Sequence, residues 1–279
     1  MNILVTLNSN YLKPLKIMLK SMFINNQDEH FTIYLMYSSL KESEIGDLNN
    51  FVVSHGHKFN SIVIEDGIFK DAPVTAYFTK EMYYRLLAYK FLPVEVERVL
   101  YLDADILVIN SMRELYEIDL EGFLCAAACH NIIPFTEVNK LRLNPLDPLT
   151  FFKAGGFYNS GVLLMNLKLQ RELIDEKVIL NFIKKNHFKL IMPDQDIINA
   201  LYSKTIKSID ETKYNFHVRY YRLYKLNSHG TVDMDYILRN TVFLHFCGRK
   251  KPWQKDYSGH FHSLYKHYEK LTFPINSGN

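Results

Sequence analysis

The alternation of apolar, strand-like segments with helical segments constrains the fold of this chain more than any other sequence feature. Residues 2–7, 31–37 and 60–65 are short apolar runs of the kind found in buried strands. Helical patterns separate them, one beginning near Pro14 and one spanning residues 41–53. Such alternation favours a mainly parallel sheet with helices on both faces, whose ligands bind at the carboxyl ends of the strands. The sequence therefore predicts an α/β fold.

The same alternation continues through the second half of the chain. Further strands are predicted at residues 99–102, 123–128, 159–166 and 241–245, and helices at residues 79–91, at residues 169–185 and from Pro193 onward. Thr79 and Asp194 are the predicted caps of the first and last of these helices.

Composition limits the function classes. The chain has 279 residues, of which 48% are apolar and 23% charged, so a folded protein of one large or two small domains is expected. A net charge of +3 is too small to indicate nucleic-acid binding. The sequence shows no signal peptide and no apolar stretch long enough to span a bilayer, so the cytoplasm is the expected location. Cys125, Cys129 and Cys247 lack metal-site spacing and are predicted to be buried apolar residues.

Two carboxylates, Asp103 and Asp105, interrupt an apolar run that extends from residue 98 to residue 110. Side chains two residues apart in an extended backbone point to the same side, so both carboxylates can converge on one ion while Ala104 leaves space between them. Two ionised carboxylates this close repel each other, and a divalent cation removes that penalty. Oxygen ligands favour magnesium or manganese over zinc.

A solvent-facing turn is the simpler alternative for this pair, because Asp-x-Asp is short and common. Turns are usually flanked by Gly, Pro, Asn or Ser, whereas Leu102 and Ile106 surround the pair with apolar side chains. The choice between a turn and a metal site therefore depends on other motifs.

Two later segments have an unusual composition. Residues 131–157 contain three prolines and the Gly155-Gly156 pair without a clear period, which is typical of a functional loop or lid. Residues 250–270 interleave Lys and His with five aromatic residues. A membrane-surface or partner-binding helix is one interpretation of this stretch, but a helix packed on the domain with a solvated basic face is favoured.

Five motifs occur in order along the chain. They are Thr6-Leu-Asn8-Ser-Asn10-Tyr11, Asp103-Ala-Asp105, Asn159-Ser-Gly-Val-Leu-Leu-Met-Asn166, Pro193-Asp-Gln195-Asp196 and His245-x-x-Gly248-x-x-Lys251-Pro-Trp253. Together they resemble glycosyltransferase family 8, the retaining sugar-nucleotide transferases that include bacterial lipopolysaccharide galactosyl- and glucosyltransferases and glycogenin. The resemblance implies a GT-A (Rossmann-like) nucleotide-sugar transferase fold. We expect this domain at residues 1–255 and a basic, aromatic helical tail at residues 256–279.

The resemblance also implies a metal site. Asp103 and Asp105 match the metal-binding pair of the family, and His245 matches its third protein ligand. One imidazole beside two carboxylates suits Mn²⁺ better than Mg²⁺, which remains the alternative. A divalent ion would stabilise the negative charge that gathers on the diphosphate of a UDP leaving group. Gly248 and Lys251 match positions where a backbone N–H and an ammonium group meet the phosphates.

The implied donor is a UDP-hexose. Asn8 and Tyr11 match the loop that holds uracil and ribose, because Tyr can stack on the base and Asn can bond its amide edge. Arg85 matches an arginine near the sugar and phosphate, with a surface ion pair as the alternative. The predicted donor-binding residues are Thr6, Asn8, Asn10, Tyr11, Arg85, Asp103, Ala104, Asp105, Asn159, His245, Gly248 and Lys251.

Gln195 and Asp194 are the predicted catalytic residues. Gln195 matches the residue beneath the anomeric carbon, and since an amide is a poor nucleophile we expect it to support positive charge on the sugar. A covalent intermediate would need a carboxylate, for which Asp194 and Asp196 are the close candidates. An ordinary polar role for Gln195 in the first turn of a helix is the alternative.

Several choices stay open in the sequence. His130-Asn131 stands where family members often have an acidic residue that grips sugar hydroxyls, so the hexose is either galactose or glucose. The acceptor is a carbohydrate or glycoconjugate without a readable motif, and the tail is a candidate for peripheral contact with the inner face of the membrane. The rival functions are a catalytically inactive nucleotide-sugar-binding protein of the same fold and a haloacid-dehalogenase-like phosphatase, whose motif needs Thr where this chain has Leu107.

Overall fold

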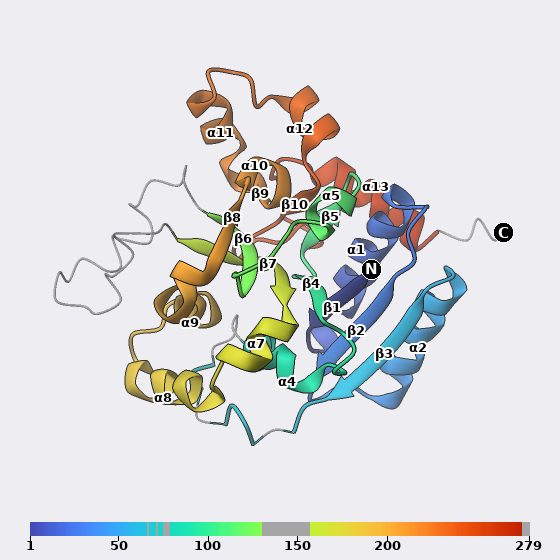
Figure 1. The fold of residues 1–279 in the computed structure, drawn as a ribbon. Helices are drawn as coiled ribbons and strands as arrows, with labels where there is room; N and C mark the ends of the chain where they lie inside the picture. Colours follow the sequence, from blue (N-terminus) through green and yellow to red (C-terminus); the bar gives the residue numbers. More distant parts are fainter. Residues whose placement is uncertain (66, 71, 75–78, 130–156, 275–279) are drawn as a thin grey trace.

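A seven-stranded sheet forms the centre of the molecule. The computed structural model describes residues 1–65, 67–70, 72–74, 79–129 and 157–274 (Figure 1). The sheet has the strand order β3-β2-β1-β4-β7-β6-β8. Its strands, in chain order, are β1 (Asn2–Thr6), β2 (Thr32–Tyr37), β3 (Lys58–Val63), β4 (Arg98–Leu102), β6 (Cys125–Cys129), β7 (Tyr158–Asn166) and β8 (Ile206–Ile209).

The sheet is mainly parallel, as predicted. Strands β1 to β4 run parallel to one another, and β6 runs parallel to β8. Strand β7 lies antiparallel between β4 and β6. The carboxyl ends of β1 and β4 therefore share one edge with the amino-terminal half of β7.

A second, three-stranded sheet adjoins the first. It has the order β5-β10-β9 and contains β5 (Ile106–Val108), β9 (Phe216–His217) and β10 (Phe243–His245). Strand β5 follows β4 after only three residues, so the chain passes from one sheet to the other at Asp103-Ala104-Asp105. The predicted Asp pair lies at the junction of the two sheets.

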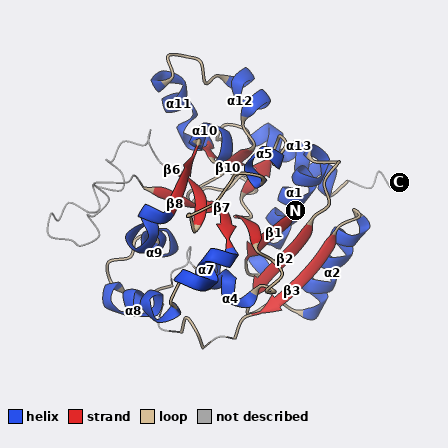
Figure 2. Cartoon of the chain, in the orientation of Figure 1, coloured by secondary structure: helices blue, strands red, loops and turns tan. Residues whose placement is uncertain are grey.

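Helices cover both faces of the large sheet (Figures 1 and 2). The α-helices are α1 (Leu12–Asn25), α2 (Glu42–Ser54), α3 (Glu81–Tyr84), α4 (Ala88–Phe91), α5 (Arg113–Tyr116), α7 (Leu167–Leu173), α8 (Glu176–Asn186), α9 (Pro193–Tyr202), α10 (Glu211–Tyr214), α11 (Tyr221–Asn227), α12 (Met234–Asn240) and α13 (His262–Thr272). Short 3₁₀ turns are η1 (Ser9–Tyr11), η2 (Arg85–Leu87), η4 (Ser203–Thr205) and η5 (Val218–Tyr220).

Successive residues of one strand enter different cores. Ile3 and Val5 of β1 pack with α1 and α2, whereas Leu4 packs with Tyr83 and Leu87 on the opposite face of the sheet. All of these side chains are fully buried. A sheet covered on both faces needs continuous apolar strands, which explains why the strands read as unbroken apolar runs.

Two predicted helices are interrupted. The predicted helix at 169–185 is divided into α7 and α8. Asn166 caps α7, since its side chain accepts from the backbone N–H of Leu169. Asp175 caps α8, since its side chain accepts from the backbone N–H of Lys177. Short polar side chains bond nearby backbone groups and so begin new helices. The predicted helix at 79–91 is divided into α3, η2 and α4.

Both predicted caps were wrong. The N-cap position of α3 is Lys80 rather than Thr79, and that of α9 is Met192 rather than Asp194. Pro193 occupies the first turn of α9, where its missing N–H costs nothing, so Asp194 already lies inside the helix. The carboxylate of Asp196 instead accepts from the backbone N–H groups of Ile191 and Met192.

The carboxyl-terminal helix α13 packs on the domain. Tyr265 and Tyr268 lie in a third core with Phe246 and Phe261, and Asn25 of α1 donates to the Tyr268 hydroxyl at 2.8 Å. Lys266 and Lys270 are exposed in α13. No helix within the described ranges has the length and apolarity needed to span a membrane. Contact of the tail with a membrane, the domain division at residue 255 and a cytoplasmic location stay predictions.

The cysteine prediction holds at two of three positions. Cys125 and Cys129 are buried in β6, and burial raises the pKa of the Cys125 thiol to about 12. Cys247 is only partly buried and lies two residues beyond the end of β10. It is therefore not the core residue that was expected.

Candidate active site

The pairing of β5 with β10 brings His245 to the Asp pair. In the antiparallel register His245 lies opposite Ile106, and the backbone N–H of Phe246 donates to the carbonyl of Asp105 at 3.0 Å. Two segments that are far apart in the sequence thus meet at the end of β4. The register of a three-residue strand sets this contact.

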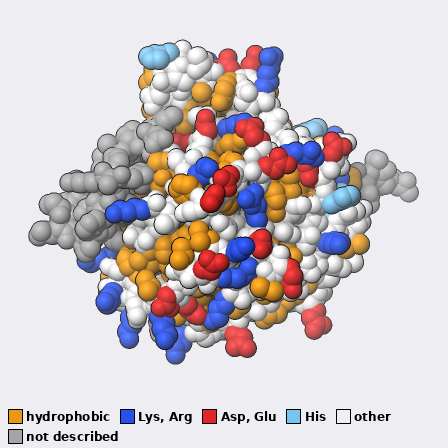
Figure 3. Space-filling model, viewed as in Figure 1, with side chains coloured by type: hydrophobic (Ala, Val, Ile, Leu, Met, Phe, Trp, Pro, Cys, Tyr) orange, Lys and Arg blue, Asp and Glu red, His pale blue; other side chains and the backbone are white. Residues whose placement is uncertain are grey.

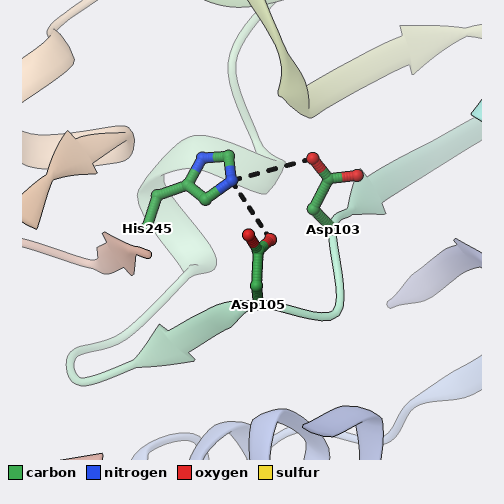
Figure 4. Close-up of side chains that lie close together, drawn as sticks. All are labelled: Asp103, Asp105 and His245. Atoms are coloured by element: carbon green, nitrogen blue, oxygen red, sulfur yellow. Dashed lines mark ion pairs between the residues drawn. The ribbon is translucent and has the colours of Figure 1, made fainter. Parts of the chain in front are cut away.

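Asp103, Asp105 and His245 form one cluster (Figure 4). Nε2 of His245 lies 3.2 Å from Oδ1 of Asp105 and 3.7 Å from Oδ2 of Asp103. One ligand atom from each residue lies within 4.8 Å of the others, and Asp105 and His245 are buried. Two carboxylates and an imidazole can hold a divalent cation.

Gly161 leaves the space that this cluster occupies. Its carbonyl accepts from the backbone N–H of Asp103 at 2.9 Å, so β7 passes directly beside the cluster. A Cβ at this position would lie 2.3 Å from Cε1 of His245 and 2.7 Å from Oδ2 of Asp103. No side chain fits there without displacing two of the three candidate ligands.

Arg85 links Asp103 to the first turn of α9. Its Nη2 lies 3.0 Å from Oδ1 of Asp103, and its Nη1 lies 3.3 Å from Oδ2 of Asp194. Nη1 also donates to the carbonyl of Ser160 at 2.8 Å, and the guanidinium lies 4.1 Å from the ring centre of Tyr101. Arg85 is buried, so the alternative of a surface ion pair is excluded.

Burial and the two carboxylates act on Arg85 in opposite directions. Burial by itself would lower the pKa of Arg85, but Asp103 and Asp194 outweigh it and raise the pKa, so the guanidinium is charged. Burial raises the pKa of Asp194, and Arg85 offsets only part of that rise.

Tyr101 forms a hydrogen bond with the carboxylate of Asp103. The Tyr101 hydroxyl donates to Oδ1 of Asp103 at 2.6 Å, and the Thr6 hydroxyl lies 3.4 Å from the same tyrosine oxygen. Burial raises the pKa of Tyr101, which keeps it a donor. Thr6 therefore reaches the cluster through Tyr101.

Lys251 balances the charge of Asp105. Its ammonium group pairs with Oδ2 of Asp105 and donates to the carbonyl of Phe246 at 3.1 Å. Burial by itself would raise the pKa of Asp105, but Lys251 and His245 outweigh it and lower the pKa. Burial by itself would lower the pKa of His245, but Cys247 and Asp105 outweigh it and raise the pKa.

The segment after β10 lies against the segment after β1. The rings of Tyr11 and Trp253 meet edge to face, with centres 5.6 Å apart. Gly248 has φ +96°, and a Cβ there would lie 2.5 Å from Nη1 of Arg219. Only glycine adopts this backbone without strain, so the turn after His245 depends on it.

Asn8 and Asn10 lie in the same turn as Tyr11. Oδ1 of Asn8 accepts from the backbone N–H of Asn10 at 3.1 Å and so caps η1. Asn10 is exposed, Asn8 is partly exposed, and Ala104 is buried between the two aspartates. Asn8 and Asn10 thus follow the carboxyl end of β1, and Ala104 follows that of β4.

The first turn of α9 meets β7 beside the cluster. Nδ2 of Asn159 lies 3.4 Å from Oε1 of Gln195, and both residues are buried. Asn199 fixes this contact, since it donates to the carbonyl of Tyr158 and accepts from the N–H of the same residue. The predicted residues Gln195, Asp194 and Asn159 are thus brought to the cluster from two elements.

Sequence reasoning missed four residues of this site: Tyr101, Ser160, Gly161 and Asn215. Gly161 and Ser160 belong to the Asn-Ser-Gly motif, so that motif held the available signal. Asn215 lies outside all five motifs, yet its Oδ1 is 2.8 Å from Nδ1 of His245. The predicted loop at residues 131–157 lies, except for Phe157, outside the described residues, as does His130-Asn131.

Acidic and basic side chains are interspersed on the face drawn in Figure 3. This distribution accords with the small net charge of the chain. The absence of a nucleic-acid partner stays a prediction.

Comparison with known proteins gives the family. The model of the family described as glycosyl transferase family 8 matches residues 2–257. The chain is 24% identical over 292 residues to general stress protein A of Bacillus subtilis, an alignment that covers 100% of this chain and 96% of that protein. It is 25% identical over 270 residues to lipopolysaccharide 1,2-glucosyltransferase of Escherichia coli, covering 91% of this chain and 73% of that protein.

Among solved structures, the chain is similar to the galactosyltransferase LgtC in complex with donor and acceptor sugar analogues. The TM-score is 0.80 at 19% identity, over 99% of this chain and 98% of that one. The predicted GT-A fold is confirmed, and the family match rules out the phosphatase interpretation. The chain is a glycosyltransferase and belongs to glycosyl transferase family 8.

Proposed function

We propose that this glycosyltransferase moves a hexose from a UDP-sugar to an acceptor hydroxyl, with retention of anomeric configuration and with the help of a divalent cation. The observation that carries this proposal is the cluster of Asp103, Asp105 and His245 beside the Lys251 ammonium. The two carboxylates and the imidazole can hold a metal ion. The adjacent ammonium group of Lys251 can bind the negative charge of a diphosphate.

The cluster residues fit a metal ion on chemical grounds. Their ligand atoms lie within 4.8 Å of one another, and Gly161 keeps the space beside them clear. Asp103, Asp105 and His245 would hold Mn²⁺, with Mg²⁺ as the alternative, since an imidazole ligand favours the softer ion. When bound, the ion supplies a Lewis acid that stabilises charge on the diphosphate leaving group.

Lys251 is proposed to bind the phosphates of the donor. Its ammonium pairs with Asp105 in the structure, so it lies beside the proposed metal ligands. The glycine turn at Gly248 allows the backbone to approach a phosphate closely. A lysine and a backbone N–H together complement the negative charge that develops during the reaction.

Tyr11 and Asn8 are proposed to bind uracil and ribose. The Tyr11 ring lies against Trp253 and presents an aromatic surface after β1. The other donor-binding proposals are those from the sequence, namely Thr6, Asn10, Arg85, Ala104 and Asn159. For Thr6 we propose an indirect role, because its hydroxyl lies near that of Tyr101.

Gln195 and Asp194 are proposed to act at the sugar. Gln195 supports positive charge at the anomeric carbon, while the acceptor attacks from the side that UDP leaves. If a covalent intermediate forms, Asp194 is the better candidate nucleophile, because Asp196 is engaged with the backbone of residues 191 and 192. The Arg85 guanidinium holds the Asp194 carboxylate beside Asp103.

The donor hexose is proposed to be galactose or glucose, and the acceptor a carbohydrate or glycoconjugate. The names of a glucosyltransferase relative and of a galactosyltransferase with the same fold support both sugars. Release of UDP from UDP-galactose and UDP-glucose, with Mn²⁺ and with a chelator, tests the proposal. We expect metal-dependent release from one of the two. UDP binding without release from either sugar would indicate a catalytically inactive nucleotide-sugar-binding protein.

A further inference from the structure

We propose that Asn215 is a positioning residue that fixes the tautomer of His245 and thereby holds its Nε2 as a metal ligand. Asn215 is 1% exposed and directly precedes β9, which pairs with β10. Its Oδ1 lies 2.8 Å from Nδ1 of His245. The inference rests on the proposed metal-binding role of His245.

The protonation of His245 follows from a chain of hydrogen bonds. The backbone N–H of Gly161 is a donor in every state, and the Asn159 side-chain atom 2.8 Å away must therefore be its oxygen. That oxygen also lies 2.8 Å from a terminal atom of Asn215, which must therefore be the amide nitrogen. The remaining atom of Asn215, its oxygen, faces His245.

An oxygen that can only accept requires a proton on Nδ1 of His245. In the neutral imidazole the other nitrogen, Nε2, then carries a lone pair, and this is the atom that faces Asp103 and Asp105. The other tautomer would direct an N–H at the same place and could not ligate a cation. A bond of this kind to the second nitrogen of a ligating histidine fixes the ring and raises its basicity.

The chain of hydrogen bonds begins at the backbone of β7. Gly161 also contacts the cluster directly, since its missing Cβ makes room for His245 and Asp103. The same residue therefore provides the space for the ligands and the donor that orients one of them. Asn159 acts in this chain as the link between Gly161 and Asn215.

Calorimetric titration of UDP, with Mn²⁺ and with a chelator, tests the proposal. Asn215→Leu keeps the size of the side chain and removes the acceptor. We expect about 10- to 100-fold weaker Mn²⁺-dependent UDP binding, which is the usual cost of losing such a partner, and unchanged binding in the chelator. Asn215→Asp keeps an acceptor for Nδ1 but places an oxygen instead of a donor against Oδ1 of Asn159, so it should recover only part of the affinity.

Asn26→Leu is the matched control. Asn26 is also buried, but its amide bonds the backbone of Met22 and Met112. This variant should bind UDP and Mn²⁺ as the parent does. Equal Mn²⁺-dependent affinity for Asn215→Leu and the parent would overturn the proposal.

A spectroscopic measurement keeps the inference testable if the Leu variant does not fold. In the parent protein loaded with diamagnetic Zn²⁺, ¹⁵N spectra should show the His245 proton on Nδ1. A proton on Nε2 would contradict the proposal.

The titration separates the two proposals. If the parent protein shows no Mn²⁺-dependent UDP binding, the proposed metal site is wrong. If the parent protein binds UDP in a Mn²⁺-dependent way and Asn215→Leu binds it with the same affinity, only the proposed role of Asn215 is wrong.

Discussion

Nε2 of His245, the last residue of β10, lies 3.2 Å from Oδ1 of Asp105, the residue that directly precedes β5. The contact exists because β10 pairs with β5 and so brings the first residue of the His245 motif to the last residue of the Asp103-Ala-Asp105 motif. Lys251 reaches the same carboxylate from the segment after β10. One aspartate is therefore shared by the candidate metal ligands and the candidate phosphate-binding lysine.

Asp105→Asn should abolish Mn²⁺-dependent UDP binding while leaving the protein folded. The substitution keeps the shape of the side chain but removes a charged ligand and the partner of Lys251. Calorimetry of UDP with Mn²⁺ measures the effect, and circular dichroism confirms the fold. Asp235→Asn, at an exposed position in α12, should bind UDP as the parent does. Unchanged affinity in Asp105→Asn would rule out its role as a ligand.

Gly161→Ala should weaken Mn²⁺-dependent UDP binding, because the added Cβ would lie 2.3 Å from Cε1 of His245 and 2.7 Å from Oδ2 of Asp103. Gly46→Ala is the matched control. Gly46 lies within α2 with no neighbouring atom inside 4 Å, so this change should stabilise the protein by about 1 kcal/mol without affecting binding. Equal UDP affinity in the two variants would show that the cluster does not need the space at Gly161.

Arg85→Met should lower the free energy of unfolding by about 3 to 5 kcal/mol, because it leaves the carboxylates of Asp103 and Asp194 without their shared cation. Urea denaturation measures this loss. Adding Asp194→Asn should recover part of it, since one of the two uncompensated charges is then removed. A single variant as stable as the parent would contradict the structural role assigned to this guanidinium.

Gln195→Ala should reduce turnover by about 100-fold while UDP affinity stays near the parent value, because its proposed interaction is made with the reacting sugar. Steady-state kinetics with the preferred UDP-hexose provide the test. Gln170→Ala removes another buried glutamine, one that donates to the carbonyl of Leu124, and should leave turnover nearly unchanged. Undiminished turnover in Gln195→Ala would remove the catalytic assignment.

The fold was predictable where local pattern and tertiary structure agree. The apolar runs that became β1, β2 and β4 are buried on both faces, so their composition alone identifies them as strands. The break between α7 and α8 was not predicted, because the apolar period continues across Ile174 and Asp175. The backbone is extended at both residues, and the Asp175 side chain caps the new helix.

The site was predictable where its residues fall into short motifs. Asp103, Asp105 and His245 were selected from the motifs, and the structure places them in one cluster. Asn215 was not predictable, because its contact with His245 depends on the pairing of β9 with β10 rather than on any local sequence feature. A buried asparagine before a two-residue strand carries no signal of its own.

The central claim is that Asp103, Asp105 and His245 hold a divalent cation against the diphosphate of a UDP-sugar. Calorimetric titration of the protein with UDP, first with Mn²⁺ and then with a chelator, tests it most directly. We predict binding that depends on Mn²⁺ and is lost or strongly weakened in the chelator. UDP binding that is equally tight in both conditions, or absent from both, would contradict the claim.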